Sequence, residues 1–214
     1  MINVFWHQCD NFGDKLTPYI LDKLGIEYRY VNKNHDSEHY ILCGSILPAC
    51  NEHSIIWGAG IAQDQEIKKP KEVLAVRGVL TREMMLRKGV DCPEIYGDAA
   101  MILPLLYVPK IEKSIKVGVI PHVVDQYLYN DYWDLNSKVE ETIDYICSCE
   151  KIVSSSFHAI LTAHVYGVPY EIIISENVIG ADMKFKDFLN TKYDLDKFIS
   201  ACPFKEKLIN HSHK

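Results

Sequence analysis

The feature that most constrains the fold of this 214-residue sequence is a repeated pattern of short apolar runs that end in small or polar residues. The runs at 40–43, 54–57, 73–76 and 95–96 are followed by Gly44-Ser45, Gly58-Ala59-Gly60, Arg77-Gly78 and Gly97-Asp98. Buried parallel strands have such uninterrupted apolar sequences, and ligands gather at the carboxyl ends of parallel strands. The pattern therefore predicts an α/β fold whose functional residues lie on a rim formed where the strands end.

A second unit of the same kind is expected after the proline-bounded stretch 104–109. Strands at 115–120, 152–153 and 170–174 alternate there with helical segments, and this order favours a parallel core. We predict two Rossmann-like halves with parallel sheets and a cleft between them, at 1–107 and 108–214. The second half is expected to end in a C-terminal helix at 195–209, interrupted near Pro203. A single continuous sheet is the competing architecture.

The first helix is expected at 16–24, with Pro18 in its first turn. The motif NFGD precedes this helix and follows the first strand. Asn11 and Gly13 allow a tight turn, and the Asp14 carboxylate can accept a hydrogen bond from a sugar hydroxyl. A cap-and-turn device without a ligand fits the same residues nearly as well.

The composition excludes several classes of protein. A net charge of -6 argues against a general affinity for nucleic acid, which needs a basic face. No apolar stretch approaches the ~20 residues of a membrane span, and the N-terminus lacks the features of a signal peptide. The seven cysteines include no C-x-x-C pair, which indicates reduced thiols. Together these observations predict a cytoplasmic protein.

The stretch KIVSSSFHAILTAHVYGVP at 151–169 predicts a buried strand that ends in serines at the start of a helix. The free backbone N–H groups and the helix dipole favour an anion such as phosphate at that position. Ser154, Ser155 and Ser156 add hydroxyl donors, and His158 is a candidate general base or a cation beside a phosphate. Alternatively, one serine is only a helix cap and His158 is a packed surface residue.

Other candidate residues follow the remaining strands. Arg77 comes after a buried strand, where its guanidinium can hold a phosphate or a carboxylate in a bidentate manner. His122 and Asp98 occupy similar positions. The glycines at 58–60 lack the third glycine and the acidic residue of a dinucleotide fingerprint, so NAD binding is not expected. No metal-binding motif is present, and we predict neither a metal nor a bound cofactor.

Eight motifs of the chain occur in the order typical of one family. They are NFGD at 11–14, GSIL at 44–47, WGAGI at 57–61, VRGVLTRE at 76–83, YGDAAMILP at 96–104, VGVIPH at 117–122, SSSFHA at 154–159 and YGVP at 166–169. In these motifs and their order, the sequence resembles the polysaccharide pyruvyltransferase family over most of its length.

The resemblance implies a GT-B-like fold and transfer of pyruvate from phosphoenolpyruvate, as a co-substrate, to a sugar of a surface polysaccharide or its lipid-linked precursor. The product is a pyruvate ketal, and phosphate is released. In the family, a histidine of the serine motif and an arginine are thought to hold or activate the donor, which maps onto His158 and Arg77. Some members carry an arginine directly after the serine pair, where this chain has Ser156. The donor phosphate would then depend on backbone amides, hydroxyls, His158 and Arg77.

The resulting assignment divides the candidate residues by role. Catalysis is assigned to His158 and Asp14, and donor binding to Arg77, Ser154, Ser155, Ser156 and His122. The half at 1–107 is the expected acceptor side, and the half at 108–214 is the expected donor side. The acceptor or rim positions, all in the half at 1–107, are Asn11, Gly13, Gly44, Ser45, Gly58, Gly60 and Asp98.

Two other functions fit the sequence. One is a GT-B glycosyltransferase that uses a nucleotide sugar, and the other is a non-catalytic carbohydrate-binding protein. A lipid-linked acceptor would require peripheral contact with the inner face of the membrane, for which the chain offers no obvious amphipathic basic helix. The sequence leaves the oligomeric state open.

Overall fold

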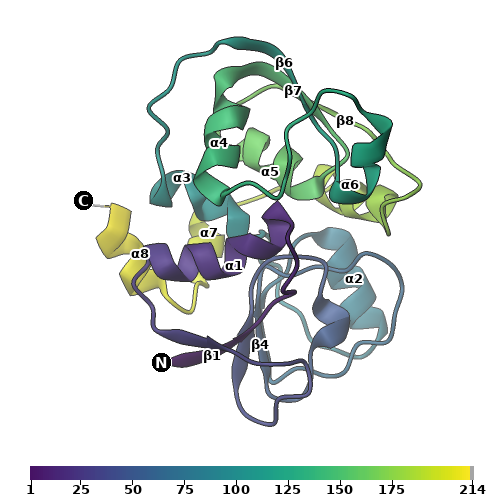
Figure 1. Cartoon of the computed structure of the whole chain (residues 1–214). Helices are drawn as coiled ribbons and strands as arrows, with labels where there is room; N and C mark the ends of the chain where they lie inside the picture. Colours follow the sequence, from purple (N-terminus) through teal and green to yellow (C-terminus); the bar gives the residue numbers. More distant parts are fainter. Residues whose placement is uncertain (213–214) are drawn as a thin grey trace.

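The first part of the chain forms a five-stranded sheet in the computed structural model, which describes residues 1–212 (Figure 1). Its strands are β1 (Ile2–Phe5), β2 (Tyr28–Tyr30), β3 (His39–Ile41), β4 (Ser54–Trp57) and β5 (Glu72–Ala75). Their spatial order is β2-β1-β3-β4-β5, and every neighbouring pair is parallel. Ile41 and Ile56 are fully buried, in keeping with the apolar character of the inner strands β3 and β4.

Helices join these strands and cover the sheet. They are α1 (Phe12–Lys23), η1 (Leu47–Ala49), α2 (Val79–Arg87), η2 (Ala99–Ile102) and α3 (Leu103–Leu106), where η marks a 3₁₀ helix. Helix α1 buries Leu16, Ile20 and Leu21, which recur at helical spacing and form the face that packs into the core.

The second sheet has three parallel strands, β6 (Ile115–Ile120), β7 (Cys149–Ser154) and β8 (Tyr170–Ile172), in the order β6-β7-β8. The 3₁₀ helix η3 (Val123–Leu128) and helix α4 (Val139–Ser148) come between β6 and β7, and α5 (Phe157–Val165) comes between β7 and β8. The predicted α/β fold with parallel, Rossmann-like sheets is confirmed, and the alternative of one continuous sheet is wrong. The predicted boundary at 107/108 lies between α3 and β6; positions 213–214 lie outside the described residues.

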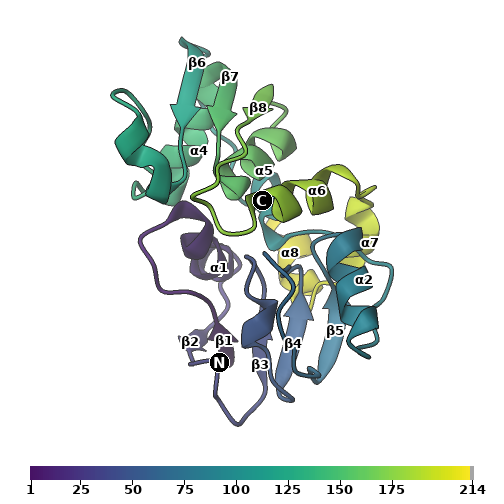
Figure 2. The ribbon, with the colours of Figure 1, turned by 90° about the vertical axis from the view of Figure 1, so that its right-hand side faces the viewer.

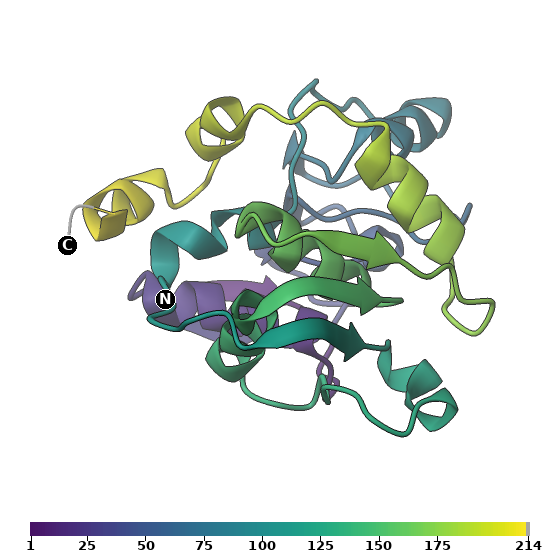
Figure 3. The same cartoon turned by 90° about the horizontal axis from the view of Figure 1, so that it is seen from above.

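The last three helices are α6 (Ala181–Leu189), α7 (Leu195–Ser200) and α8 (Lys205–Ser212). Helix α6 lies on the β8 side of the second sheet (Figure 3), and α7 and α8 return to the first sheet (Figure 2). The Trp57 indole N–H donates to the Phe198 carbonyl at 3.2 Å, and the two rings stack with centroids 4.4 Å apart. The C-terminal segment therefore packs on the first sheet although it follows the second, and the predicted interruption near Pro203 is confirmed.

Two predicted elements differ in their limits. Helix α1 begins at Phe12, so Pro18 lies inside the helix and Asp14 lies in its first turn. The short run at 95–96 contributes a single parallel bridge between Val76 and Tyr96 rather than a strand. Over residues 1–212, no helix has the length and apolar character needed to cross a membrane.

Candidate functional site

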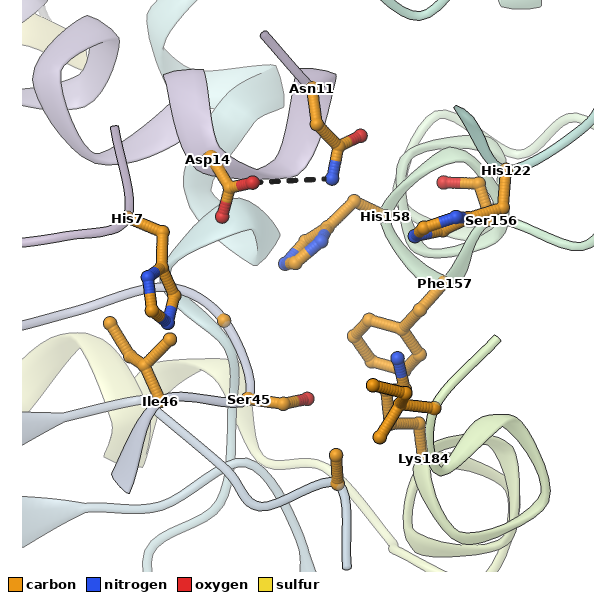
Figure 4. Close-up of a pocket in the computed structure, with 13 residues that line it drawn as sticks. His7, Asn11, Asp14, Ser45, Ile46, His122, Ser156, Phe157, His158 and Lys184 are labelled. Carbon is orange, nitrogen blue, oxygen red and sulfur yellow. Dashed lines mark hydrogen bonds between the residues drawn. The ribbon is translucent and has the colours of Figure 1, made fainter. Parts of the chain in front are cut away.

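A cavity of about 240 Å³ lies among residues that follow strands of both sheets (Figure 4). The first sheet supplies its lining from the segments after β1, β3 and β4, and the second sheet from the segments after β6, β7 and β8. The lining residues are His7, Asn11, Asp14, Gly44, Ser45, Ile46, Ala62, His122, Ser156, Phe157, His158, Ile179 and Lys184. The cavity therefore lies where strands of both sheets end.

The structure brings together only part of the predicted set. Of the predicted residues, the cavity is lined by Asn11, Asp14, Gly44, Ser45, His122, Ser156 and His158. Those that lie outside its lining are Gly13, Gly58, Gly60, Arg77, Asp98, Ser154 and Ser155. His7 and Lys184 line the cavity and were not predicted.

The N-termini of α1 and α5 both open into the cavity. Their N-cap residues, Asn11 and Ser156, belong to the lining, and neither side chain caps its own helix. The N–H groups in the first turn of a helix carry a partial positive charge. Two such helix ends around one small cavity make it suited to an anion.

His158 occupies the first turn of α5, beside Gly13 of α1. A Cβ atom at position 13 would lie 2.9 Å from both Cγ and Cε1 of the imidazole, so glycine leaves the room that the ring occupies. His158 Nε2 lies 3.5 Å from Oδ2 of Asp98, which forms an ion pair when the ring is protonated. Gly13 and Asp98 thus fix the position of the histidine without lining the cavity themselves.

Asp98 is fully buried at the N-cap of η2, where it accepts a hydrogen bond from the Ala100 N–H at 3.0 Å. Burial raises the pKa of Asp98, but the nearby His158, the Ala100 N–H and the charge of Arg77 together hold the pKa below its ordinary value. The charged form of Asp98 is therefore maintained at neutral pH.

Asp14 faces the same cavity from α1. The Asn11 side-chain amide donates to Asp14 Oδ2 at 3.3 Å. Burial raises the pKa of Asp14, and it outweighs the opposing effects of His158, His7, Asn11 and Lys184. A raised pKa makes the Asp14 carboxylate a better proton acceptor for a ligand in the cavity.

Lys184 of α6 brings an amine into the cavity. Burial, together with the positive charge of Arg77, lowers the pKa of Lys184 to about 8, while Asp14 opposes this shift. His122 lines the same cavity, and burial and the charge of Lys184 lower its pKa, against the effect of Asp125. The cavity therefore holds cationic or easily protonated groups that an anionic ligand would stabilise in their charged form.

The three consecutive serines have separate roles. Ser154 donates its hydroxyl to a backbone carbonyl of β6 and accepts from the Ser156 N–H at 2.9 Å. The Ser155 hydroxyl donates to Asp125 Oδ2 at 2.6 Å and accepts from the His122 N–H at 2.9 Å. Both hydroxyls are buried and engaged in shaping the strand end, which corrects their assignment to donor binding. Ser156 alone of the three lines the cavity.

Arg77 does not reach the cavity, which corrects its assignment as a ligand-binding residue. The side chain is fully buried. Its Nε donates to Asp187 Oδ2 at 3.2 Å, Nη1 to the Ser45 hydroxyl at 2.6 Å and Nη2 to the Ile61 carbonyl at 2.6 Å. The guanidinium carbon also lies 5.0 Å from the centre of the Phe157 ring. Arg77 therefore supports two lining residues, Ser45 and Phe157, from behind.

The glycines after β4 are required by close packing. Gly58 has φ +100°, and a Cβ there would lie 2.8 Å from the Ala99 backbone nitrogen. A Cβ at Gly60 would lie 2.7 Å from Arg77 Nε. These residues were predicted as rim positions, and they instead allow the chain to pack closely on Ala99 and Arg77. Within residues 1–212, no group of three or more histidine, cysteine or acidic side chains is arranged to hold a metal ion.

Known proteins resemble this chain in sequence and in fold. The sequence model of the polysaccharide pyruvyl transferase family matches residues 8–170. An uncharacterized protein of Acanthamoeba polyphaga mimivirus is 28% identical over 218 residues, covering 90% of this chain and 75% of that protein. A functionally uncharacterized protein of Klebsiella pneumoniae superposes with a TM-score of 0.52 at 11% identity, covering 90% of this chain and 92% of the other. At that identity, the structural likeness concerns the fold alone.

Proposed function

The chain belongs to the polysaccharide pyruvyl transferase family, and from this premise we propose that it transfers pyruvate from phosphoenolpyruvate to a sugar as a ketal. The acceptor in this proposal is a surface polysaccharide or its lipid-linked precursor, which the chain would meet at the inner face of the membrane. The two sheets then correspond to the two halves of a GT-B-like fold, with 1–107 on the acceptor side and 108–214 on the donor side.

The observation that supports the donor best is the meeting of two helix N-termini and Lys184 in one small cavity. Phosphoenolpyruvate carries a phosphate and a carboxylate on adjacent carbons, so its site needs two sets of donors close together. The N-termini of α1 and α5 offer one set each. In place of the arginine that some family members carry at the position of Ser156, Lys184 supplies positive charge and His122 supplies a hydrogen-bonding ring nitrogen.

Ketal formation defines what the residues must do. One proton is added to C3 of phosphoenolpyruvate, which becomes a methyl group, and C2 becomes electron-deficient. Two sugar oxygens form bonds to C2, and the bond between C2 and the phosphate oxygen breaks. The two sugar hydroxyls each lose a proton. One of these protons accounts for the proton gained at C3, and the other leaves with the phosphate. The reaction therefore needs an acid and a base that both work near neutral pH.

His158 and Asp14 are assigned these two tasks. In its protonated form His158 gives a proton to C3, and the buried carboxylate of Asp98 stabilises the imidazolium. Asp14 accepts the proton of the attacking hydroxyl, which its raised pKa favours. Asp14 and His158 lie in the first turns of α1 and α5, so the acid and the base face the donor from opposite elements.

The test compares His158→Ala with His164→Ala, because both histidines lie on α5 and His164 is exposed outside this cavity. Phosphate release from phosphoenolpyruvate is measured with a panel of sugar and glycolipid acceptors. Loss of a general acid lowers the rate by about 10²–10⁴-fold, and we expect that loss in His158→Ala alone.

Calorimetry with phosphoenolpyruvate and with UDP- and GDP-sugars tests the donor independently of the acceptor. We expect binding of phosphoenolpyruvate by the unaltered protein. Binding of a nucleotide sugar without binding of phosphoenolpyruvate would instead identify a glycosyltransferase, and sugar binding without any donor binding would identify a carbohydrate-binding protein.

A further inference from the structure

Asp187 is a buried carboxylate that takes no part in the proposed chemistry. Its Oδ1 accepts from the backbone N–H groups of Leu80 and Thr81, at 2.8 and 3.1 Å. Its Oδ2 accepts from the Thr81 hydroxyl at 2.6 Å and from Arg77 Nε at 3.2 Å. Asp187 therefore occupies the N-terminus of α2 in the way that an anionic ligand would.

Thr191 makes a second attachment at the same place. Its hydroxyl accepts from the Val79 N–H at 2.9 Å and donates to the Asp187 carbonyl at 2.5 Å. A Cβ at Gly78 would lie 2.6 Å from this hydroxyl and 2.7 Å from the Asp187 carbonyl oxygen. Gly78 thus allows the end of α6 to approach the start of α2, whose own N-cap supplies no side-chain hydrogen bond.

These contacts join two parts of the molecule that belong to different sheets. Helix α2 follows β5 of the first sheet, and α6 follows β8 of the second sheet. The other side of α6 packs on α5, where Phe185 and Phe188 lie 5.9 and 6.0 Å from the Phe157 ring. Lys184 lies three residues before Asp187, about one helical turn away on a neighbouring part of the surface, and it reaches the cavity.

We propose that Asp187 is a positioning residue, whose carboxylate fastens α6 to the start of α2 and thereby holds Lys184 in the cavity. Arg77 extends the same arrangement, since it joins Asp187 to Ser45 and lies over Phe157, both of which line the cavity. The placement of Lys184 does not depend on the reaction, but its importance for donor binding rests on the proposed function.

The test measures the titration of the Lys184 amine in the full chain by competitive acetylation with acetic anhydride and mass spectrometry. The charged groups that act on this amine are Arg77, Asp14 and His122, which come from three different segments. In the unaltered protein we expect Lys184 to titrate with a pKa of about 8. In Asp187→Asn, release of α6 should move the Lys184 pKa toward its ordinary value of 10.5.

The direction of the change separates positioning from simple electrostatics. If α6 stays in place, removal of the Asp187 charge leaves Arg77 less neutralised, and the Lys184 pKa should fall further. A value at or below that of the unaltered protein would therefore overturn the proposal. Asp182→Asn is the matched control, because Asp182 lies on the same helix and its side chain is 63% exposed. Among residues 1–212, its one ion-pair partner is Lys186. This variant should leave Lys184 unchanged.

A second variant guards against loss of the fold. Thr81→Val removes the hydrogen bond from the Thr81 hydroxyl to Asp187 Oδ2 and leaves every charge in place. An upward shift of the Lys184 pKa in this folded variant supports the positioning role of Asp187. An unchanged Lys184 pKa contradicts that role. Calorimetry then adds the donor. Asp187→Asn should weaken phosphoenolpyruvate binding about tenfold, the size of one lost charge-assisted contact. If the Lys184 pKa shifts as expected but neither the unaltered protein nor any variant binds phosphoenolpyruvate, the proposed donor is refuted and the positioning role of Asp187 stands.

Discussion

Replacing Gly13 by alanine should destabilise the protein and displace His158. In helix α1 the change by itself is favourable, because alanine is preferred over glycine in a helix by about 1 kcal/mol. The added methyl group, however, would lie 2.9 Å from Cγ and Cε1 of His158. Carbon atoms pack comfortably at about 3.5–4.0 Å, so these two carbons must retreat by roughly 0.6–1.1 Å, and Nδ1 of the ring, which would lie closer still to the methyl group, must retreat further.

The two effects can be compared on one scale. Overpacking of a closely packed site costs about 1–3 kcal/mol, which equals or exceeds the gain of about 1 kcal/mol from helix propensity. We therefore expect Gly13→Ala to lower the free energy of unfolding by about 0–2 kcal/mol, the difference between these two ranges. A shift of the ring also changes its 3.5 Å distance to Asp98, and a 1 Å misplacement of a reacting group can cost about 10²-fold in rate.

The assay is a double-mutant cycle in urea denaturation. In the His158→Ala background the ring is gone, so Gly13→Ala should become neutral or stabilising by up to about 1 kcal/mol. The coupling free energy between positions 13 and 158 is then expected to be about 1–3 kcal/mol. Equal effects of Gly13→Ala in the two backgrounds would refute the reasoning, as would a Gly13→Ala variant whose His158 NMR signals are unchanged.

Two further predictions concern pH. The affinity for phosphoenolpyruvate, measured by calorimetry, should decrease as the pH rises through about 8, where Lys184 loses its charge. Lys184→Met should make the affinity less dependent on pH in this range. An equally steep decrease in the variant would show that another group controls the affinity. The second prediction concerns Asp98, whose pKa is lower in the folded protein than in the unfolded chain. Its charge therefore contributes fully to stability above the unfolded pKa of about 3.9. This contribution is lost as the pH falls through the lower pKa of the folded protein. Asp98→Asn should therefore flatten the acid limb of the free energy of unfolding in urea titrations, and an unchanged limb would contradict the pairing with His158.

The part of the site that follows from local sequence was predictable. Asn11, Asp14, His122, Ser156 and His158 each lie in the segment or the first helical turn that follows a strand, and parallel strands present their carboxyl ends at one edge. Strand ends can be recognised from short apolar runs, so the rim could be predicted without knowing the packing. The order of strands and helices also predicted two parallel sheets, although it left one continuous sheet as an alternative that only the structure excludes.

The residues that sequence reasoning missed or misassigned depend on contacts between distant segments. Lys184 lies on a helix with ordinary amphipathic spacing, and no local pattern marks it as facing a cavity. Asp98 was predicted as a rim residue, but its distance of 3.5 Å from His158 arises only when η2 packs against α5. Arg77 has the position of a ligand-binding residue, yet its partner Asp187 is 110 residues away.

At three places in this fold, the starts of α1, α2 and α5, a helix follows a strand and begins beside a glycine or a serine. Each of these helix starts is called a corner below. At the start of α1 and of α5 the first-turn amides open into the cavity, whereas at the start of α2 they are occupied by Asp187. The physical potential for binding an anion is the same in all three places. Which corners remain open to a ligand is decided by where the chain places its own carboxylates, and that is a property of tertiary structure. At the start of α2, the buried carboxylate of Asp187 occupies the free amides and connects segments that follow two different sheets. The starts of α1 and α5 remain available for an external anion.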